Sequence, residues 1–154
     1  MQPPKNIRDV LAKNIPLLFD GATGTEIYNR GVFINRCFED ANLSSPALIA
    51  EVHRDYVAAG ANVLSTNSWG ANRFKLLKHN LQDSTALINR KSAELAREAI
   101  GHDGFVAGSI GPLGVRIEPW GPTSYQEAQD AFGEQIVGLR EGGVDMISFE
   151  TFGD

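Results

Sequence analysis

Four short apolar runs punctuate the chain, and each of them stops at a polar residue. The runs cover residues 17–19, 63–65, 105–108 and 146–149, and the residues that end them are Asp20, Thr66, Ser109 and Glu150. Successive stops lie 41 to 46 positions apart, with helical patterns in the intervals. This rhythm is typical of β-α units that build a parallel sheet. The spacing therefore predicts an α/β fold whose reactive side chains gather at the carboxyl ends of the strands.

Helical periodicity fills the intervals between the apolar runs. The clearest helices are predicted over residues 45–60, 83–101 and 124–142. The first begins with a serine and a proline, which suit the cap and the first turn of a helix. The last begins with Ser124 and Glu127, the pattern of a capping box. Shorter helical turns are expected over residues 23–31 and 72–78, with an amphipathic lead-in over 1–15 and an irregular loop over 32–38.

The number of units is half of what a closed barrel requires. A (β/α)8 TIM barrel takes about 250 residues, whereas this chain has 154. We therefore expect an α/β fold of the (β/α)8 TIM-barrel type with only the first four strands, a half barrel, with residues 1–154 forming the N-terminal part of a domain that is incomplete at its C-terminus. Such a unit leaves strand edges open. Three explanations of the missing half fit the sequence: the chain is a fragment, another copy completes it, or the units form an open sheet.

Composition and charge exclude several classes of function. The net charge is −5, with acids and bases interspersed, and this disfavours a nucleic-acid partner. No apolar stretch approaches the length needed to cross a bilayer. The N-terminus lacks the apolar core of a secretory signal. Cys37 is the single cysteine, so no internal disulfide is available, and we expect a cytoplasmic location.

The histidines do not suggest a metal centre. His53, His79 and His102 are too irregularly placed to give a metal-ligand spacing. All three fall on predicted helices or in the loops that end them, and we expect each of them at the surface. A lone cysteine likewise cannot build a thiolate metal site.

Two segments after the first two runs could form a ligand site. DGATGT at 20–25 offers a carboxylate for an ammonium group and free backbone N–H groups for a carboxylate. The same segment also fits a helix N-cap followed by turn glycines. STNS at 65–68 places four small polar side chains at a strand end, which suits a site, but also a loop that satisfies its own backbone.

Glu150 ends the fourth run, where burial of a carboxylate is costly unless it is paired or hydrated. In a barrel, the tips of the first and fourth strands face one cavity. Asp20 and Glu150 could then hold an ammonium group from two sides. An acid–base pair for glycoside hydrolysis is the alternative, and it is less favoured because few aromatic residues are present to form a glycan groove.

Four segments together resemble the homocysteine S-methyltransferase family in their order and spacing. They are DGATGT at 20–25, STNSWGANR at 65–73, GSIGPLG at 108–114 and FETF at 149–152. Two further stretches, GVFINRCF at 31–38 and VRIEPWG at 115–121, look most like bacterial bifunctional members. In those proteins the methyltransferase barrel precedes a methylenetetrahydrofolate reductase domain. The resemblance spans residues 15–154.

The resemblance implies a homocysteine-binding barrel that transfers a methyl group to the sulfur of homocysteine, giving methionine. Asp20 and Glu150 would hold the amine of the substrate. Gly21 and Thr66 would meet its carboxylate. Asn67 and Ser109 would lie nearby in the pocket. The sequence does not identify the methyl donor, for which methylfolate and S-methylmethionine are the candidates.

The resemblance also implies a zinc ion that activates the thiol, held in the family by three cysteines from the second half of the barrel. None of those cysteines occurs here, and Cys37 lies in a different segment. The chain is therefore expected to carry the amino-acid half of the site and to have little methyl-transfer activity alone. The alternative is a non-catalytic half barrel that binds a small amino acid, a complementing half-barrel subunit or a second copy.

Overall fold

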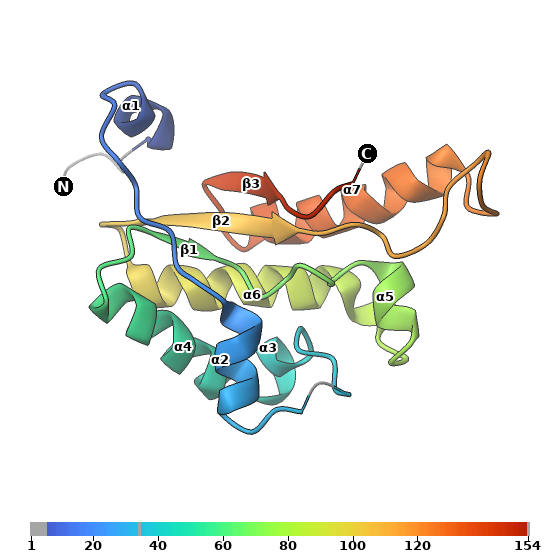
Figure 1. Ribbon diagram of the computed structural model, residues 1–154, viewed down its shortest axis with the longest axis horizontal. Coiled ribbons are helices and arrows are strands. Elements are labelled where there is room, and N and C mark those ends of the chain that lie inside the picture. The colour runs from blue at the N-terminus through green and yellow to red at the C-terminus, as the bar shows by residue number, and fades with distance from the viewer. Residues whose placement is uncertain (1–5, 34, 154) are drawn as a thin grey trace.

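The computed structural model describes residues 6–33 and 35–153, and its centre is a three-stranded parallel sheet (Figure 1). The strands are β1 (Val63–Ser65), β2 (Phe105–Ile110) and β3 (Met146–Phe149), in the order β1-β2-β3. Val63 pairs with Phe105, and Ala107 pairs with Met146. The sheet confirms the predicted α/β fold and the last three of the four predicted strands.

The first predicted strand, residues 17–19, is not a strand, so the prediction of four strands is wrong. Phe19 alone pairs with β1, in an isolated parallel bridge to Val63. The N–H of Leu18 donates to the side-chain Oδ1 of Asn62 at 3.1 Å instead of to a main-chain carbonyl. Pro16 has no N–H to add to a ladder. The segment nevertheless runs beside β1 and brings Asp20 to the same end of the sheet as the strand tips.

The three long helices lie where the sequence predicts them. They are α4 (Pro46–Ala58), α6 (Thr85–Ile100) and α7 (Tyr125–Glu141). The capping box at the start of α7 is formed by Ser124 and Glu127. Ser45 precedes α4 as expected, but its side chain makes no capping hydrogen bond.

The short elements fill the remaining connections. They are α1 (Ile7–Leu11), α2 (Thr23–Asn29), α3 (Ala41–Ser44), α5 (Arg73–Leu77) and the 3-10 helix η1 (Gln82–Ser84). Of these, α3 has no counterpart in the sequence prediction. Residues 1–5 of the predicted lead-in and Ile34 of the predicted loop lie outside the described residues. Across the described part of the chain, no helix combines the length and apolar character that a bilayer crossing requires.

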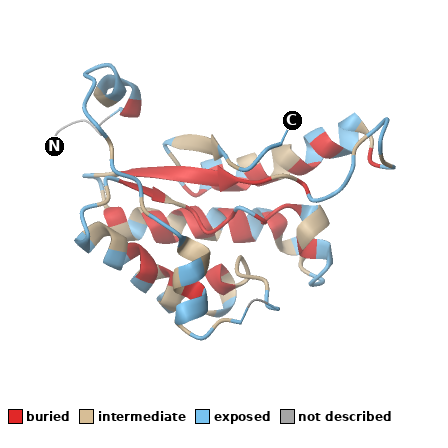
Figure 2. Ribbon diagram, in the orientation of Figure 1, coloured by how far each residue is buried: buried red, intermediate tan, exposed pale blue. Residues whose placement is uncertain are grey.

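Side chains of successive residues in the strands face opposite sides of the sheet and so belong to different cores. Leu64 and Val106 pack against Ala96 and Ile100 of α6. The opposite face presents Val63, Phe105 and Ala107, which pack against Ile7 of α1. Every residue of β2 is buried (Figure 2). Toward the carboxyl ends of the strands this second face becomes polar, with Ser65, Ser109 and Ser148, and the candidate site lies there.

Two glycines let α7 approach α6 closely. A Cβ placed on Gly138 would lie 2.6 Å from the main-chain oxygen of Ala86. A Cβ on Gly142 would lie 2.4 Å from the main-chain oxygen of Arg90. Because real Cβ atoms do not come so close to a carbonyl oxygen, only glycine permits this separation of the two backbones.

His53 is fully buried, so its predicted surface position is wrong. It follows Ile49 by four residues and therefore shares the buried face of α4 with it. Neither ring nitrogen has a hydrogen-bond partner among the described residues. Burial disfavours the imidazolium and lowers the pKa of His53 from 6.5 to about 4.

Acid should destabilise the chain through His53. The unfolded chain takes up a proton near pH 6.5, whereas the folded chain does so only near pH 4, so stability falls as pH drops through that interval. We expect a loss of about 2 to 3 kcal/mol in the free energy of unfolding by pH 4.5. Substituting His53→Leu removes this dependence.

Urea unfolding at pH 7.5 and pH 4.5 measures the effect as the difference between the wild-type chain and His53→Leu. His102→Asn is the control, because His102 is exposed. If the wild type and His53→Leu differ by the same free energy at both pH values, His53 does not titrate as described.

Candidate functional site

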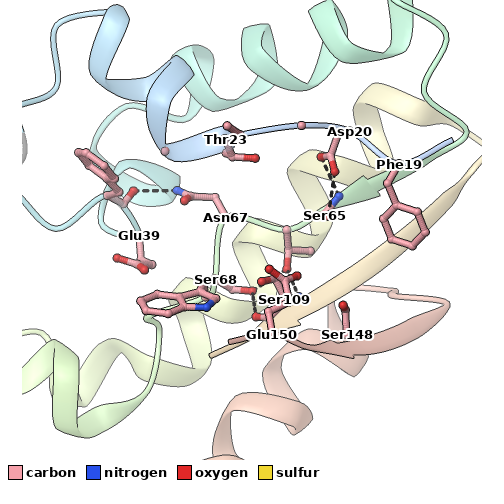
Figure 3. A pocket seen from close by; sticks show the side chains of 16 residues that line it. Phe19, Asp20, Thr23, Glu39, Ser65, Asn67, Ser68, Ser109, Ser148 and Glu150 are labelled. Carbon is pink, nitrogen blue, oxygen red and sulfur yellow. Dashed lines mark hydrogen bonds between the residues drawn. The ribbon is translucent and has the colours of Figure 1, made fainter. Parts of the chain in front are cut away.

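A cavity of about 560 Å³ opens at the carboxyl ends of the strands (Figure 3). The turn before α2 borders it on one side, and the loop after β1 and the tips of β2 and β3 border it on the others. All six residues that the sequence analysis singled out line this cavity: Asp20, Gly21, Thr66, Asn67, Ser109 and Glu150.

Asp20 is held by the main chain and side chain of one residue. The N–H of Ser65 donates to Oδ2 and its hydroxyl donates to Oδ1, both at 2.8 Å. Burial raises the pKa of Asp20 from 3.8 to about 6. The hydrogen bonds from Ser65 oppose that rise, and the negative charge of Glu150 adds to it.

Glu150 follows β3, and its N–H donates to the carbonyl of Ile110 at 2.9 Å. Its negative charge contributes a smaller part of the rise in the pKa of Asp20, behind burial. No lysine, arginine or histidine among residues 6–33 and 35–153 forms an ion pair with either carboxylate. The cavity therefore holds two uncompensated acids, an arrangement that favours a cationic ligand.

Several backbone donors at the cavity have no hydrogen-bond partner within the described chain. Among them are the N–H groups of Gly21 and Asn67. A Cβ on Gly21 would lie 3.0 Å from the hydroxyl of Tyr56, so glycine allows the chain to pass close to α4. Unpaired N–H groups are suited to a carboxylate.

The hydroxyl of Thr66 is already engaged within the protein. Its Oγ1 accepts the N–H of Ser109 at 2.9 Å and lies 2.5 Å from the hydroxyl of Ser68. The Ser68 hydroxyl donates its one proton to the carbonyl of Ser109 at 2.7 Å. Thr66 must therefore donate to Ser68, and its hydroxyl proton is not available to a ligand.

The hydroxyl of Ser109 is in the opposite situation. Ser109 is 3% exposed and lines the cavity. Its Oγ has no hydrogen bond to the described residues, while its main-chain N–H and carbonyl are fixed by Thr66 and Ser68. A free hydroxyl on a fixed backbone can donate to a bound ligand.

Asn67 uses its side chain mainly to secure the loop. Both protons of Nδ2 are engaged, by the carbonyl of Phe38 at 2.7 Å and Oδ1 of Asn42 at 3.1 Å. In return, Nδ2 of Asn42 donates to the carbonyl of Asn67 at 2.8 Å. These bonds tie the loop after β1 to α3 and leave the Oδ1 atom and the main-chain N–H of Asn67 for other partners.

Sequence reasoning missed a third carboxylate in the cavity, that of Glu39. Its Oε1 accepts the N–H of Gly70 at 2.7 Å, and its Oε2 accepts the thiol of Cys37 at 3.4 Å. Glu39 sits in a stretch without helical or strand periodicity, so no local pattern marks it. Only the folding of that stretch against the loop after β1 brings it to the site.

The two tryptophans of the chain, Trp69 and Trp120, take different positions. Trp69 lines the cavity, and its ring would lie 2.4 Å from a Cβ on Gly111. The ammonium group of Lys75 lies 3.5 Å from the centroid of the same ring. Trp120 is 82% exposed and does not line this cavity.

The residues present do not fit a zinc ion. Across 6–33 and 35–153, no three histidine, cysteine, aspartate or glutamate side chains are grouped to hold a metal. Burial and Glu39 raise the pKa of Cys37 to about 12. The thiol therefore stays protonated at neutral pH, and a protonated thiol is a poor metal ligand.

The chain matches a family model described as homocysteine S-methyltransferase over residues 17–154. It is 30% identical over 161 residues to methionine synthase from Mycobacterium tuberculosis, covering 97% of this chain and 13% of that protein. It is 30% identical to homocysteine S-methyltransferase 1 from Saccharomyces cerevisiae, covering 88% of this chain and 48% of that one.

A solved structure of a homocysteine methyltransferase is also similar to this chain. The homocysteine methyltransferase MmuM from Escherichia coli, crystallised in a metallated form, superposes with a TM-score of 0.79 and 29% identity. The match covers 95% of this chain and 57% of MmuM. The chain thus spans about half the length of MmuM and of the yeast protein, and 13% of the methionine synthase. Because the family model matches residues 17–154, which is most of this chain, the chain belongs to the homocysteine S-methyltransferase family.

Proposed function

We propose that this chain binds homocysteine through its amino-acid group and so provides the methyl-acceptor side of the family reaction, which yields methionine. The observation that carries the proposal is the pair of uncompensated carboxyl groups, Asp20 and Glu150, on one cavity. Their partner would be the ammonium group of the substrate. This arrangement in turn supports the half-barrel architecture, because it needs the end of the segment beside β1 and the tip of β3 on one rim.

The substrate carboxylate would lie against donors that the protein leaves free. These are the N–H groups of Gly21 and Asn67 and the hydroxyl of Ser109. Thr66 would act indirectly, because its hydroxyl proton is committed to Ser68 and its oxygen holds Ser109. The proposal thus keeps all six residues at the site but gives Thr66 a supporting part.

Activation of the thiol is not assigned to this chain. Methyl transfer to sulfur requires a thiolate, and the described residues form no ligand cluster for the zinc ion that the resemblance implies. We therefore propose that the isolated chain binds homocysteine without methylating it. S-methylmethionine and methylfolate remain the donors to be tested for the complete site.

Calorimetry on the purified chain tests the binding. We expect homocysteine and methionine to bind, and 4-mercaptobutyrate, which lacks the amine, to bind at least tenfold more weakly. Asp20 must be ionised to attract the ammonium group, so affinity should fall about tenfold from pH 7 to pH 5. Equal affinity for 4-mercaptobutyrate, or binding of glucose instead, would overturn the proposal. Methionine formation with zinc and either donor at ordinary enzyme rates would contradict the binding-only assignment.

A further inference from the structure

Buried side-chain amides from three helices hold the carbonyls of the loop after β1. Nδ2 of Asn42 in α3 donates to Asn67. Nε2 of Gln135 in α7 donates to the carbonyl of Ser68 at 2.7 Å, and Nδ2 of Asn89 in α6 donates to that of Ala71 at 2.7 Å. The three amide side chains belong to fully buried residues. The loop that lines the cavity is thereby fixed from behind.

Gln135 is costly as a packing residue. Its Oε1 is buried and has no hydrogen-bond partner among the described residues. An unsatisfied buried acceptor is destabilising, whereas a leucine or methionine in the same place would leave no such group. Gln135 does not line the cavity. The presence of an amide here therefore points to the hydrogen bond that it donates to Ser68.

Further hydrogen bonds link Ser68 to the tips of β1 and β2. Gln135 holds the carbonyl of Ser68, and the hydroxyl of Ser68 donates to the carbonyl of Ser109 at 2.7 Å. Thr66 donates to the same Ser68 hydroxyl, and its Oγ1 accepts the N–H of Ser109 at 2.9 Å. Ser68 and Thr66 each have a single hydroxyl proton, so these two hydroxyl hydrogen bonds have one orientation. The series links α7 to the tips of β1 and β2.

We propose that Gln135 is a positioning residue for the amino-acid site: through Ser68 and Thr66 it sets where Ser109 presents its free hydroxyl. The inference rests on the proposed function, because Ser109 is there assigned to the carboxylate of the substrate. Gln135 has no contact with the ligand in this scheme. It acts on the half of the site that receives the carboxylate and leaves Asp20 and Glu150 unaffected.

The test substitutes Gln135→Met, which preserves length and volume but removes the donor. At pH 7 we expect the affinity for homocysteine to fall about tenfold, measured by calorimetry. The affinity for 3-aminopropane-1-thiol, which has the amine and thiol but no carboxylate, should change less than twofold. The matched control is Gln129→Met, an exposed glutamine of the same helix, which should change neither affinity.

A second measurement needs no ligand. Amide hydrogen exchange of Ser109, followed by NMR, should become at least tenfold faster in Gln135→Met, because the acceptor Thr66 is no longer fixed. The amide of Val106 in the same strand should keep its wild-type rate, since it donates to Asp145. Unchanged exchange at Ser109 would overturn the positioning role.

The two ligands separate the remaining outcomes. If homocysteine and 3-aminopropane-1-thiol weaken equally, Gln135→Met has loosened the whole site, and the proposal fails. If Ser109 exchange accelerates but the wild-type chain binds neither homocysteine nor methionine, the proposed function fails while the coupling of α7 to the strand tip stands. If the wild type binds homocysteine and Gln135→Met binds it with the same affinity, the positioning role of Gln135 is refuted while the proposed function stands.

Discussion

Replacing Asp20 with asparagine should weaken homocysteine binding about 100-fold and, at the same time, stabilise the folded chain at pH 7. The loss of affinity follows from removing one charge of a partly buried pair with the substrate ammonium group. Asparagine keeps the shape of the side chain. Its Oδ1 can still accept the N–H of Ser65, and its Nδ2 can donate to the Ser65 hydroxyl.

The gain in stability follows from the raised pKa of Asp20. The folded chain binds the Asp20 proton up to about pH 6, whereas the unfolded chain releases it near 3.8. The stabilisation that Asp20 contributes is therefore complete below pH 3.8 and is lost as pH rises through 6. A fully buried group with this pKa difference would cost about 3 kcal/mol at pH 7. Because Asp20 is partly open to water, we expect Asp20→Asn to gain about 1 to 2 kcal/mol.

Urea unfolding and calorimetry on the same samples measure both effects. Asp103→Asn serves as the control, since Asp103 is an exposed aspartate away from the cavity and should leave affinity and stability unchanged. Asp20→Asn that binds homocysteine like the wild type would remove Asp20 from the site. If Asp20→Asn is less stable than the wild type at pH 7, burial does not govern the pKa of the Asp20 carboxyl group.

Gly138→Leu should destabilise the chain by about 4 kcal/mol, a large part of the stability of a domain this size. Even the first side-chain atom would lie 2.6 Å from the main-chain oxygen of Ala86 and 3.0 Å from Cβ of Asn89. A helix backbone cannot yield as a flexible side chain can, so α7 must move away from α6. That movement would open the core on both helices.

Gly133→Leu is the matched control within α7. A Cβ at Gly133 meets nothing within 4 Å, and leucine is a better helix former than glycine. We expect Gly133→Leu to leave the free energy of unfolding unchanged or to raise it by up to about 1 kcal/mol. Equal stabilities of the Gly138 and Gly133 variants in urea would show that α6 and α7 can separate at no cost.

Asp20 and His53 titrate in overlapping intervals with opposite consequences. As pH rises from about 4 to 6, the stability contribution of Asp20 falls while that of His53 grows. The two effects partly cancel in the wild-type chain. We therefore expect a shallow pH profile for the wild type and a steeper profile in each single variant, Asp20→Asn and His53→Leu.

The strand tips could be predicted from the sequence because their position is a local property. An apolar run that stops at a polar residue identifies the end of a strand, and parallel strands bring such ends to one rim. Asp20 and Glu150 were therefore predictable. The prediction of a first strand over residues 17–19 was wrong because the sequence does not show that the N–H of Leu18 donates to the side chain of Asn62.

Residues that reach the site through packing could not be found in this way. Glu39 follows a segment without periodicity, and Gln135 sits in the middle of a helix, 67 positions from its partner Ser68. His53 did carry a signal, since it lies four residues after Ile49 on an apolar stripe. We predicted a surface position because the side chain is polar, but the helical geometry of α4 places His53 on the buried face.

Asp20 and Glu150 stand beyond the outermost chain segments of the sheet, Asp20 after the segment beside β1 and Glu150 after β3. Their separation is consequently a measure of how strongly the sheet coils. Any influence that flattens the sheet would spread the pair apart while leaving each carboxyl in its own surroundings. Ligand affinity would then respond to distant mutations that alter sheet curvature, with no change in a single residue of the rim.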